Sequence, residues 1–197
     1  MKLGVTRFKR GLILSAAAKL FSERGYAATT IDAITEELAA SRRVIYDHFA
    51  GKAEILAAIC EQAVRFSSDL AERVARETGT PPEKLRRLAR DFTAIVIDNQ
   101  DYITISSTEL KFLPAESQRR ILRLQEKFHR ILVGILSEGA ASGAFAVPDP
   151  AMTALAISGM IIWTHRWYRA RGRLSAAEVA DAMAEAALRM AGAARSP

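Results

Sequence analysis

The chain has 197 residues, half of them hydrophobic and a quarter of them charged. This composition is typical of a folded globular protein and excludes a chain that is disordered over most of its length. The 28 Lys and Arg residues outnumber the 22 Asp and Glu residues, and the formal charge of +6 favours a polyanionic partner such as nucleic acid, a phosphorylated metabolite or an anionic membrane.

The first fifty residues predict three short helices joined by tight turns. Apolar residues of the segment 12–21 recur every three or four positions, and Gly25 is placed to end that helix. Thr30 and Ser41 are candidate N-caps of a second helix and of a third helix over 42–48. Two short helices joined by a turn of three to four residues form a helix-turn-helix, whose second helix enters the major groove of DNA.

The remainder of the chain predicts five longer helices, because apolar residues again recur every three or four positions. We expect them from Ile55 to near Gly79, from Pro82 to Val96, from Pro114 to the glycines at 139–143, over 150–171, and over 176–191. Ser175 and Glu178 form a capping-box pattern before the last of these helices. No alternating run of β-branched residues predicts a strand, so the expected fold class is all-α.

Several classes of protein are excluded or disfavoured by what the sequence lacks. The single cysteine, Cys60, excludes an intramolecular disulfide and a zinc site built from several cysteines. The first residues do not read as a secretory signal, and the most apolar stretch, 151–163, is too short to cross a bilayer. We therefore expect a cytoplasmic protein that does not enter a membrane.

Three motifs follow one another within residues 8–60: ILSAAAKLFSERGY at 13–26, TIDAI at 30–34, and SRRVIYDHF at 41–49 with Lys52 after it. Together they resemble the DNA-binding head of TetR-type bacterial repressors. The resemblance implies a helix-turn-helix DNA-binding domain at 1–50 and a helical ligand-binding and dimerisation domain at 51–197. It also implies a transcriptional regulator, expected to be a repressor, that binds a palindromic operator in double-stranded DNA as a homodimer and is released by a small effector.

Candidate DNA contacts are of two kinds. Arg42 and Arg43 begin the third helix, where long basic side chains reach base edges, most readily O6 and N7 of guanine. Phosphate contacts are expected where helices begin or where the family pattern implies them. These residues are Thr30, Ser41, Tyr46, His48 and Lys52.

Three positions depart from the common pattern of the family. Ala39 stands where the turn between the two helices usually has glycine, so we expect a turn that does not use a positive φ. Arg43 replaces a small residue, which suggests an additional base or phosphate contact. Asp47 replaces an aromatic residue, and three alternatives remain open: it accepts from a cytosine N4 amine, pairs with Arg43, or points away from the DNA.

One segment of the second half, 159–175, resembles the body of TetR-type regulators that respond to acyl-coenzyme A thioesters. An acyl-CoA offers an apolar tail, a purine that stacks on aromatic rings and phosphates that arginine binds. The expected ligand contacts are Phe92, Leu110, Phe112, Phe128, Leu132, Trp163, Arg166, Trp167, Tyr168 and Arg169. The alternatives are that the tryptophans belong to the dimer core, and that the effector is another apolar or aromatic compound, as in multidrug-sensing repressors.

The last two helices are expected to pair with those of a second copy, because two recognition helices must meet half-sites about 34 to 36 Å apart or a multiple of that spacing. The small and flexible apolar residues expected there are Ala154, Ala156, Ile157, Met160, Ile161, Val179, Met183, Ala186, Ala187 and Met190. No spacing suggests a catalytic group, a metal site or a cofactor, so a helical acyl-CoA-binding enzyme is the weakest alternative.

Overall fold

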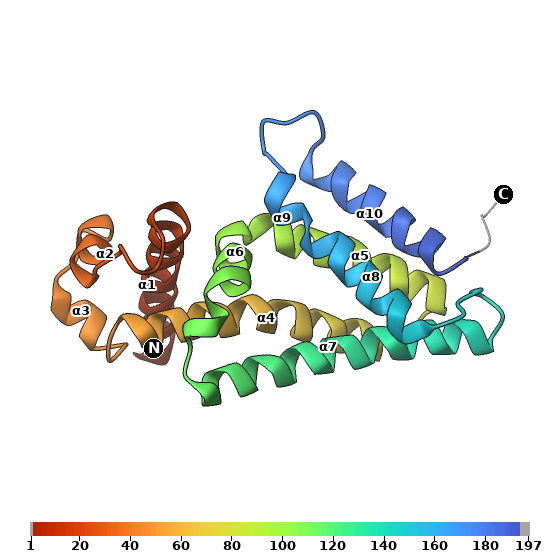
Figure 1. Cartoon of the computed structure of the whole chain (residues 1–197), viewed down its shortest axis with the longest axis horizontal. Helices are drawn as coiled ribbons and strands as arrows, with labels where there is room; N and C mark the ends of the chain where they lie inside the picture. The colour runs from red at the N-terminus through yellow and green to blue at the C-terminus, as the bar shows by residue number, and fades with distance from the viewer. Residues whose placement is uncertain (1, 194–197) are drawn as a thin grey trace. The chain divides into compact units, whose positions relative to one another are not determined.

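The chain folds into helices throughout the range that the computed structural model describes, residues 2–193 (Figure 1). The all-α class predicted from the sequence is confirmed. In chain order the helices are α1 (Lys2–Arg24), α2 (Ile31–Glu37), α3 (Arg42–Tyr46), α4 (Lys52–Arg76), α5 (Pro81–Asp98), α6 (Gln100–Glu109), the 3-10 helix η1 (Leu110–Phe112), α7 (Ala115–Ala141), α8 (Pro150–Ile162), α9 (Thr164–Trp167) and α10 (Ala176–Met190). No helix in the described range is long and apolar enough to cross a membrane.

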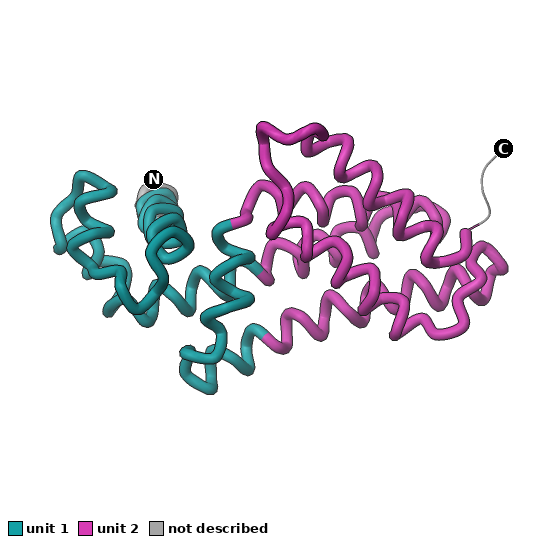
Figure 2. The backbone as a smooth tube through the Cα atoms, turned by 45° about the horizontal axis from the view of Figure 1, so that its top comes forward, with its two compact units in different colours: residues 1–63, 101–121 teal, residues 64–100, 122–197 magenta. Residues whose placement is uncertain are grey.

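The helices are grouped in two compact units (Figure 2). The first unit consists of the chain up to Ala63 together with Asp101–Ile121, and the second consists of Val64–Gln100 and the chain from Leu122 on. The expected division after residue 50 falls inside the first unit, because Lys52 at the start of α4 donates hydrogen bonds to the turn between α1 and α2.

The helix-turn-helix of the first unit is formed by α2 and α3, as predicted. Gly25 ends α1 with a φ of +84°, and its N–H donates to the carbonyl of Phe21 at 3.0 Å. Thr30 caps α2 by accepting from the N–H of Ala33 at 3.1 Å. Ser41 occupies the N-cap position of α3, although its side chain makes no capping hydrogen bond.

The turn between α2 and α3 passes through the left-handed region at Ala39, where φ is +48°. The prediction that the turn avoids a positive φ is therefore wrong. The reason is a Schellman motif: the N–H of Ala39 donates to the Glu36 carbonyl at 3.0 Å, and the N–H of Ala40 donates to the Thr35 carbonyl at 2.9 Å. These hydrogen bonds hold the turn even though a Cβ in this conformation costs about 1 kcal/mol relative to glycine.

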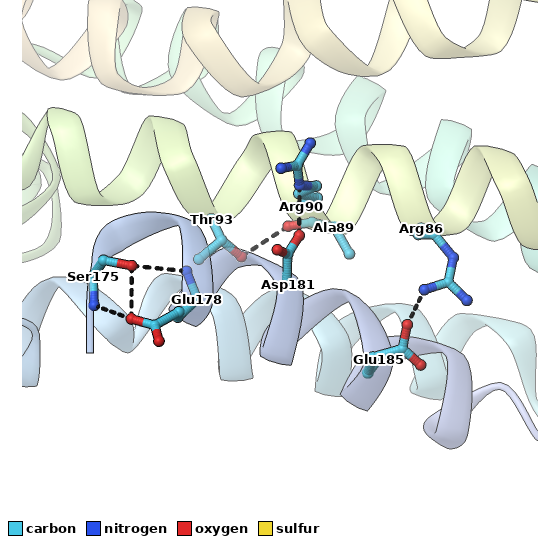
Figure 3. A network of polar contacts seen from close by, with 8 residues as sticks. All are labelled: Arg86, Ala89, Arg90, Thr93, Ser175, Glu178, Asp181 and Glu185. Carbon is cyan, nitrogen blue, oxygen red and sulfur yellow. Dashed lines mark hydrogen bonds and ion pairs between the residues drawn. The ribbon is translucent and has the colours of Figure 1, made fainter. Parts of the chain in front are cut away.

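The core of the second unit is built around α5, which packs against α8 and α10. Its buried face carries Leu85, Leu88, Phe92 and Val96, and the ring of Phe92 lies 4.8 Å from that of Phe128 on α7. The predicted capping box of α10 is confirmed, since the N–H of Ser175 donates to Glu178 at 2.8 Å and the N–H of Glu178 donates back to the Ser175 hydroxyl at 3.3 Å (Figure 3).

Surface ion pairs add a second connection between α5 and α10. Arg90 donates to Asp181 at 2.6 Å and Arg86 is paired with Glu185, so two arginines of one helix face two carboxylates of the other (Figure 3). All four side chains are exposed, and exposed pairs contribute little individually. They favour the register in which the apolar faces of the two helices meet.

The predicted helix over 150–171 is wrong at its C-terminal end. α8 stops at Ile162, α9 adds a single turn, and the chain becomes extended at Tyr168, with φ −62° and ψ 137°. The physical reason is tertiary: Tyr168 is buried with Ile97 and Val179. The side-chain amide of Gln100 also donates to the Tyr168 carbonyl at 3.2 Å.

The helix α6 was not expected from the sequence. Ile105 is its one fully buried residue, so the segment lacks the apolar stripe on which the other helices were predicted. A prediction based on a periodic apolar pattern therefore misses this helix.

Two glycines of α7 provide a matched test of the core. A Cβ at Gly139 would lie 2.0 Å from Cδ2 of the buried Phe145 ring, whereas a Cβ at Gly134 would meet nothing within 4 Å. We expect Gly139→Ala to lower the free energy of unfolding by about 1–3 kcal/mol because the ring must move. Gly134→Ala should raise it by about 0.5–1 kcal/mol because it removes a flexible residue from a helix interior. Urea unfolding measures both, and changes of the same sign would contradict the proposed packing.

Candidate functional site

The outer side of α3 is the candidate site in the first unit. Ile45 and Phe49 are almost completely buried and anchor one side of this helix region. Arg42, Arg43 and Tyr46 are exposed on its other sides. Exposed Asp47 follows them at the C-cap, and exposed Thr30 and Ser41 occupy the N-caps of α2 and α3. The structure thus brings together on the helix-turn-helix six of the seven residues predicted as DNA contacts; the seventh, Lys52, is oriented differently.

The two arginines at the start of α3 have different surroundings. The guanidinium of Arg42 forms a two-pronged ion pair with the carboxylate of Asp32 in the first turn of α2, through Nε and Nη2. Hydrogen bonding to this carboxylate raises the pKa of Arg42. By contrast, the guanidinium of Arg43 has no hydrogen-bond or ion-pair partner within residues 2–193. In the same range Asp47 is not paired with Arg43, so that alternative for Asp47 finds no support.

The ammonium of Lys52 points toward the protein. It donates to the carbonyls of Tyr26 at 2.8 Å, Ala27 at 3.3 Å and Thr29 at 2.7 Å, and it lies 4.4 Å from the centre of the Tyr26 ring. These contacts fasten the first turn of α4 to the turn that leads into α2.

Arg10 is a residue of the candidate site that the sequence analysis did not identify. Its guanidinium lies 4.1 Å from the centre of the Phe49 ring, and its Nη1 donates to the carbonyl of His48 at 3.0 Å. Arg10 therefore holds the C-terminal end of the recognition segment on α1. Nothing in the local pattern around Arg10 could have indicated this, because its partners lie almost forty positions later in the chain.

The residues predicted to bind the ligand do not form one cluster. The described core of the second unit contains Phe92, Phe128 and Leu132, while Tyr168 belongs to a smaller cluster beside α10. Leu110 and Phe112 belong to the first unit, where Phe112 is exposed. Trp163, Arg166, Trp167 and Arg169 are exposed on the second unit. Among these, the guanidinium of Arg166 lies 5.9 Å from the Trp163 ring, and Arg169 donates to the carbonyls of Arg166 and Tyr168.

The outer face of α8 is apolar and exposed. Its large side chains follow a helical spacing, and the tryptophan at the end of the helix is 60% exposed. The residues of this α8 outer face are Met152, Leu155, Ala156, Gly159, Ile162 and Trp163. Trp167, in α9, is 44% exposed.

Half of the residues predicted for a dimer interface lie instead in the core of the chain itself. Ala154, Ile157, Ile161, Val179 and Ala187 are almost completely buried. Since a residue buried in its own chain cannot contact a second copy, the prediction is wrong for these five. Ala156 and Met190 are exposed, and Met160, Met183 and Ala186 are half-buried.

Two buried polar atoms of the second unit have no hydrogen-bond partner in the described chain: Nε2 of His165 and Oγ of Ser68. The Nδ1 of His165 lies 2.6 Å from the carbonyl of Ile162. Because a carbonyl only accepts, Nδ1 carries a proton in this contact, and the buried Nε2 is left without a hydrogen-bond partner. Buried polar groups without a partner are rare, which makes these two atoms candidates for contact with a bound molecule.

Neither a nucleophilic cysteine nor a metal site is supported by the residues that the structure describes. Burial raises the pKa of the Cys60 thiol to about 12, so this side chain is a core residue and not a nucleophile. Within residues 2–193 no group of three His, Cys, Asp or Glu side chains is placed to hold a metal ion.

Comparison with known proteins gives two family matches. The model for bacterial regulatory proteins of the tetR family matches residues 13–59, and the model for the tetracyclin repressor-like C-terminal domain matches residues 78–191. Residues 13–59 contain the helix-turn-helix, and residues 78–191 contain most of the second unit.

Individual relatives agree with these matches. The solved TetR family transcriptional regulator PfmR from Thermus thermophilus is 32% identical, with a TM-score of 0.82 over 90% of this chain and 97% of that chain. The transcriptional repressor KstR2 of Mycobacterium tuberculosis is 25% identical over 178 residues, 89% of each chain. The structure of AibR in complex with isovaleryl coenzyme A and operator DNA shares the fold, with a TM-score of 0.79 over 90% of this chain and 97% of that chain at 24% identity.

The helix-turn-helix with its exposed basic face, the helical second unit and the two family matches lead to one conclusion. This chain belongs to the TetR family of bacterial regulatory proteins and is a DNA-binding transcriptional regulator, not an enzyme.

Proposed function

We propose that the protein is an effector-released repressor that binds a palindromic operator as a homodimer, with α3 as the recognition helix. The observation that carries the assignment of α3 is the exposed guanidinium of Arg43, which has no partner within residues 2–193 and stands on a helix anchored by buried Ile45 and Phe49. An arginine free of intramolecular partners keeps its donors for a guanine edge.

The neighbouring side chains are proposed to position α3 or to bind phosphates. Asp32 holds the Arg42 guanidinium against α2, which fixes the start of α3. The residues proposed to bind phosphates are Thr30, Ser41, Tyr46 and His48. Phosphate contacts set the register of the helix on the duplex, while base contacts provide sequence preference.

The homodimer is proposed to form through the α8 outer face. Exposed apolar residues gathered on one face of a helix mark an interaction surface, and twofold pairing would bury this face against its own copy. Leu155 and Ile162 are exposed on this face, and the 60% exposure of Trp163 supports the alternative in which it belongs to the dimer core.

The effector is proposed to be an acyl-CoA-like thioester whose acyl part enters the second unit. The fold is compatible with such a ligand, because AibR has been solved with isovaleryl coenzyme A. Phe92, Phe128 and Leu132 supply an apolar environment for an acyl chain. Polar atoms without partners, at His165 and Ser68, are available to an amide N–H and a carbonyl of the ligand.

The role of Arg43 is tested by Arg43→Ala, with Arg42→Ala as the matched control. We expect Arg43→Ala to weaken operator binding about ten- to a hundredfold and to relax preference at one base position. Arg42→Ala should change affinity without relaxing any position, because its guanidinium is held by Asp32. The measurement is binding to a duplex selected by the parent protein from a random pool, and to each single-base variant of it. An unchanged base preference in Arg43→Ala would exclude the base contact.

The dimer interface is tested by Leu155→Glu on the α8 outer face, with Leu122→Glu as the control. Both leucines are exposed, but Leu122 lies on α7. Sedimentation velocity should find Leu155→Glu monomeric and Leu122→Glu dimeric, because two carboxylates brought together by a twofold axis repel each other across an apolar contact. A dimer that survives Leu155→Glu places the interface elsewhere.

The effector class is tested by calorimetric titration with acetyl-, medium-chain, long-chain and phenylacetyl-CoA, and with coenzyme A alone. We expect one acyl class to bind, coenzyme A alone to bind weakly or not at all, and His165→Asn to weaken binding about tenfold, since asparagine keeps a donor for the Ile162 carbonyl but loses the Nε2 acceptor. Trp167→Ala should keep the parent affinity for the thioester, because the exposed Trp167 side chain belongs to the protein surface and not to the core of the second unit. Absence of binding by every thioester would favour another apolar effector.

A further inference from the structure

The first turn of α4 is fastened to the start of the helix-turn-helix by one side chain, Lys52. Its ammonium has three N–H donors, and the three carbonyls of Tyr26, Ala27 and Thr29 lie at 2.8, 3.3 and 2.7 Å. The Tyr26 ring, 4.4 Å away, covers the same cation. Hydrogen bonds from a charged donor are among the stronger polar contacts in proteins.

The turn that accepts these hydrogen bonds is itself tightly held. Thr29 is completely buried, and its hydroxyl donates to the carbonyls of Gly25 at 2.9 Å and Leu20 at 3.3 Å. The next residue, Thr30, is the N-cap of α2. A displacement of the Lys52 ammonium would therefore shift Thr30, the residue at which the helix-turn-helix begins.

The charged ammonium of Lys52 interacts with backbone carbonyls of the protein itself. With its three donors directed at carbonyls, the half-buried side chain keeps none for a phosphate. The peptide N–H of Ala50, just before α4, donates to the carboxylate of Glu54 at 2.7 Å, so the start of α4 is fixed from both sides of Lys52.

We propose that Lys52 is a positioning residue for operator binding: it locks the α1–α2 turn onto the first turn of α4, so that the helix-turn-helix and the start of α4 move as one body. It acts through geometry and not through a phosphate contact. The proposal rests on operator binding through α3, as proposed above, and adds to it a residue outside α3 that positions the helix-turn-helix.

The experiment compares Lys52→Arg with Lys52→Met. Arginine keeps the charge, but its planar fork cannot direct donors at three carbonyls that converge on one ammonium. We therefore expect both variants to weaken binding to the selected duplex about tenfold. In both, the slope of log affinity against log salt concentration should stay at the parent value, since no phosphate contact is lost.

A phosphate contact by Lys52 would give the opposite result. If Lys52 bound a phosphate, Lys52→Arg would bind as the parent does, and Lys52→Met would lower the magnitude of the salt slope by about 1. Arg43→Met, which removes an exposed cation from α3, is the control in which a smaller slope is expected. A parent-like Arg43→Met would count against the proposed DNA contact and not against the role of Lys52.

Thermal unfolding would reveal whether the Lys52 variants fail to fold. In that case a second pair of variants, at Tyr26, tests the same proposal. Tyr26→Leu removes the ring that covers the ammonium without changing any charge, and Tyr26→Phe keeps the ring. We expect weaker operator binding in Tyr26→Leu and parent-like binding in Tyr26→Phe. Equal affinities of Tyr26→Leu and the parent would overturn the positioning role.

Discussion

A helix of five residues does not form alone in water. Ordering the backbone of the first turn costs more conformational entropy than the few hydrogen bonds of that turn offset. α3 is such a helix, and the DNA recognition proposed for it depends on the contacts that hold it in place. Buried Ile45 and Phe49 anchor its inner side, and the Schellman turn through Ala39 sets its direction of entry. Arg10 supports its C-terminal end through the Phe49 ring and the His48 carbonyl.

Four basic residues of the first unit, Arg10, Arg42, Arg43 and Lys52, differ in what their side chains contact. Arg10 and Lys52 satisfy backbone carbonyls and cover aromatic rings, and Arg42 is paired with Asp32. Arg43 stands apart, with an exposed guanidinium and no partner within residues 2–193. Net charge therefore favours a polyanionic partner, whereas the local contacts are what support Arg43 as the cation proposed to contact a base.

The features predicted correctly from the sequence are those that neighbouring residues decide. Gly25, Thr30 and the Ser175–Glu178 capping box act within one helical turn, so their roles follow from spacing alone. The long helices were predicted because each buries one apolar face. The break after Ile162 and the direction of the Lys52 ammonium depend on partners far away in the chain, such as Gln100 and Tyr26, and no local pattern contains them.

The error in the dimer prediction has a specific cause, and it bears on regulation. α8 is apolar on both sides: Ala154, Ile157 and Ile161 face the core of the second unit, while Leu155 and Ile162 are exposed. A helix that is apolar all round has no periodic signal to tell its core face from its partner face. The same helix then meets both the core proposed to receive the effector and the surface proposed to meet the second copy. An acyl chain that enters this core must displace inner side chains of a closely packed helix, and such a displacement moves the outer face with it. Because an effector shifts an equilibrium only by its different affinity for the two states, the proposed response is limited by how differently the acyl chain binds the two arrangements of α8.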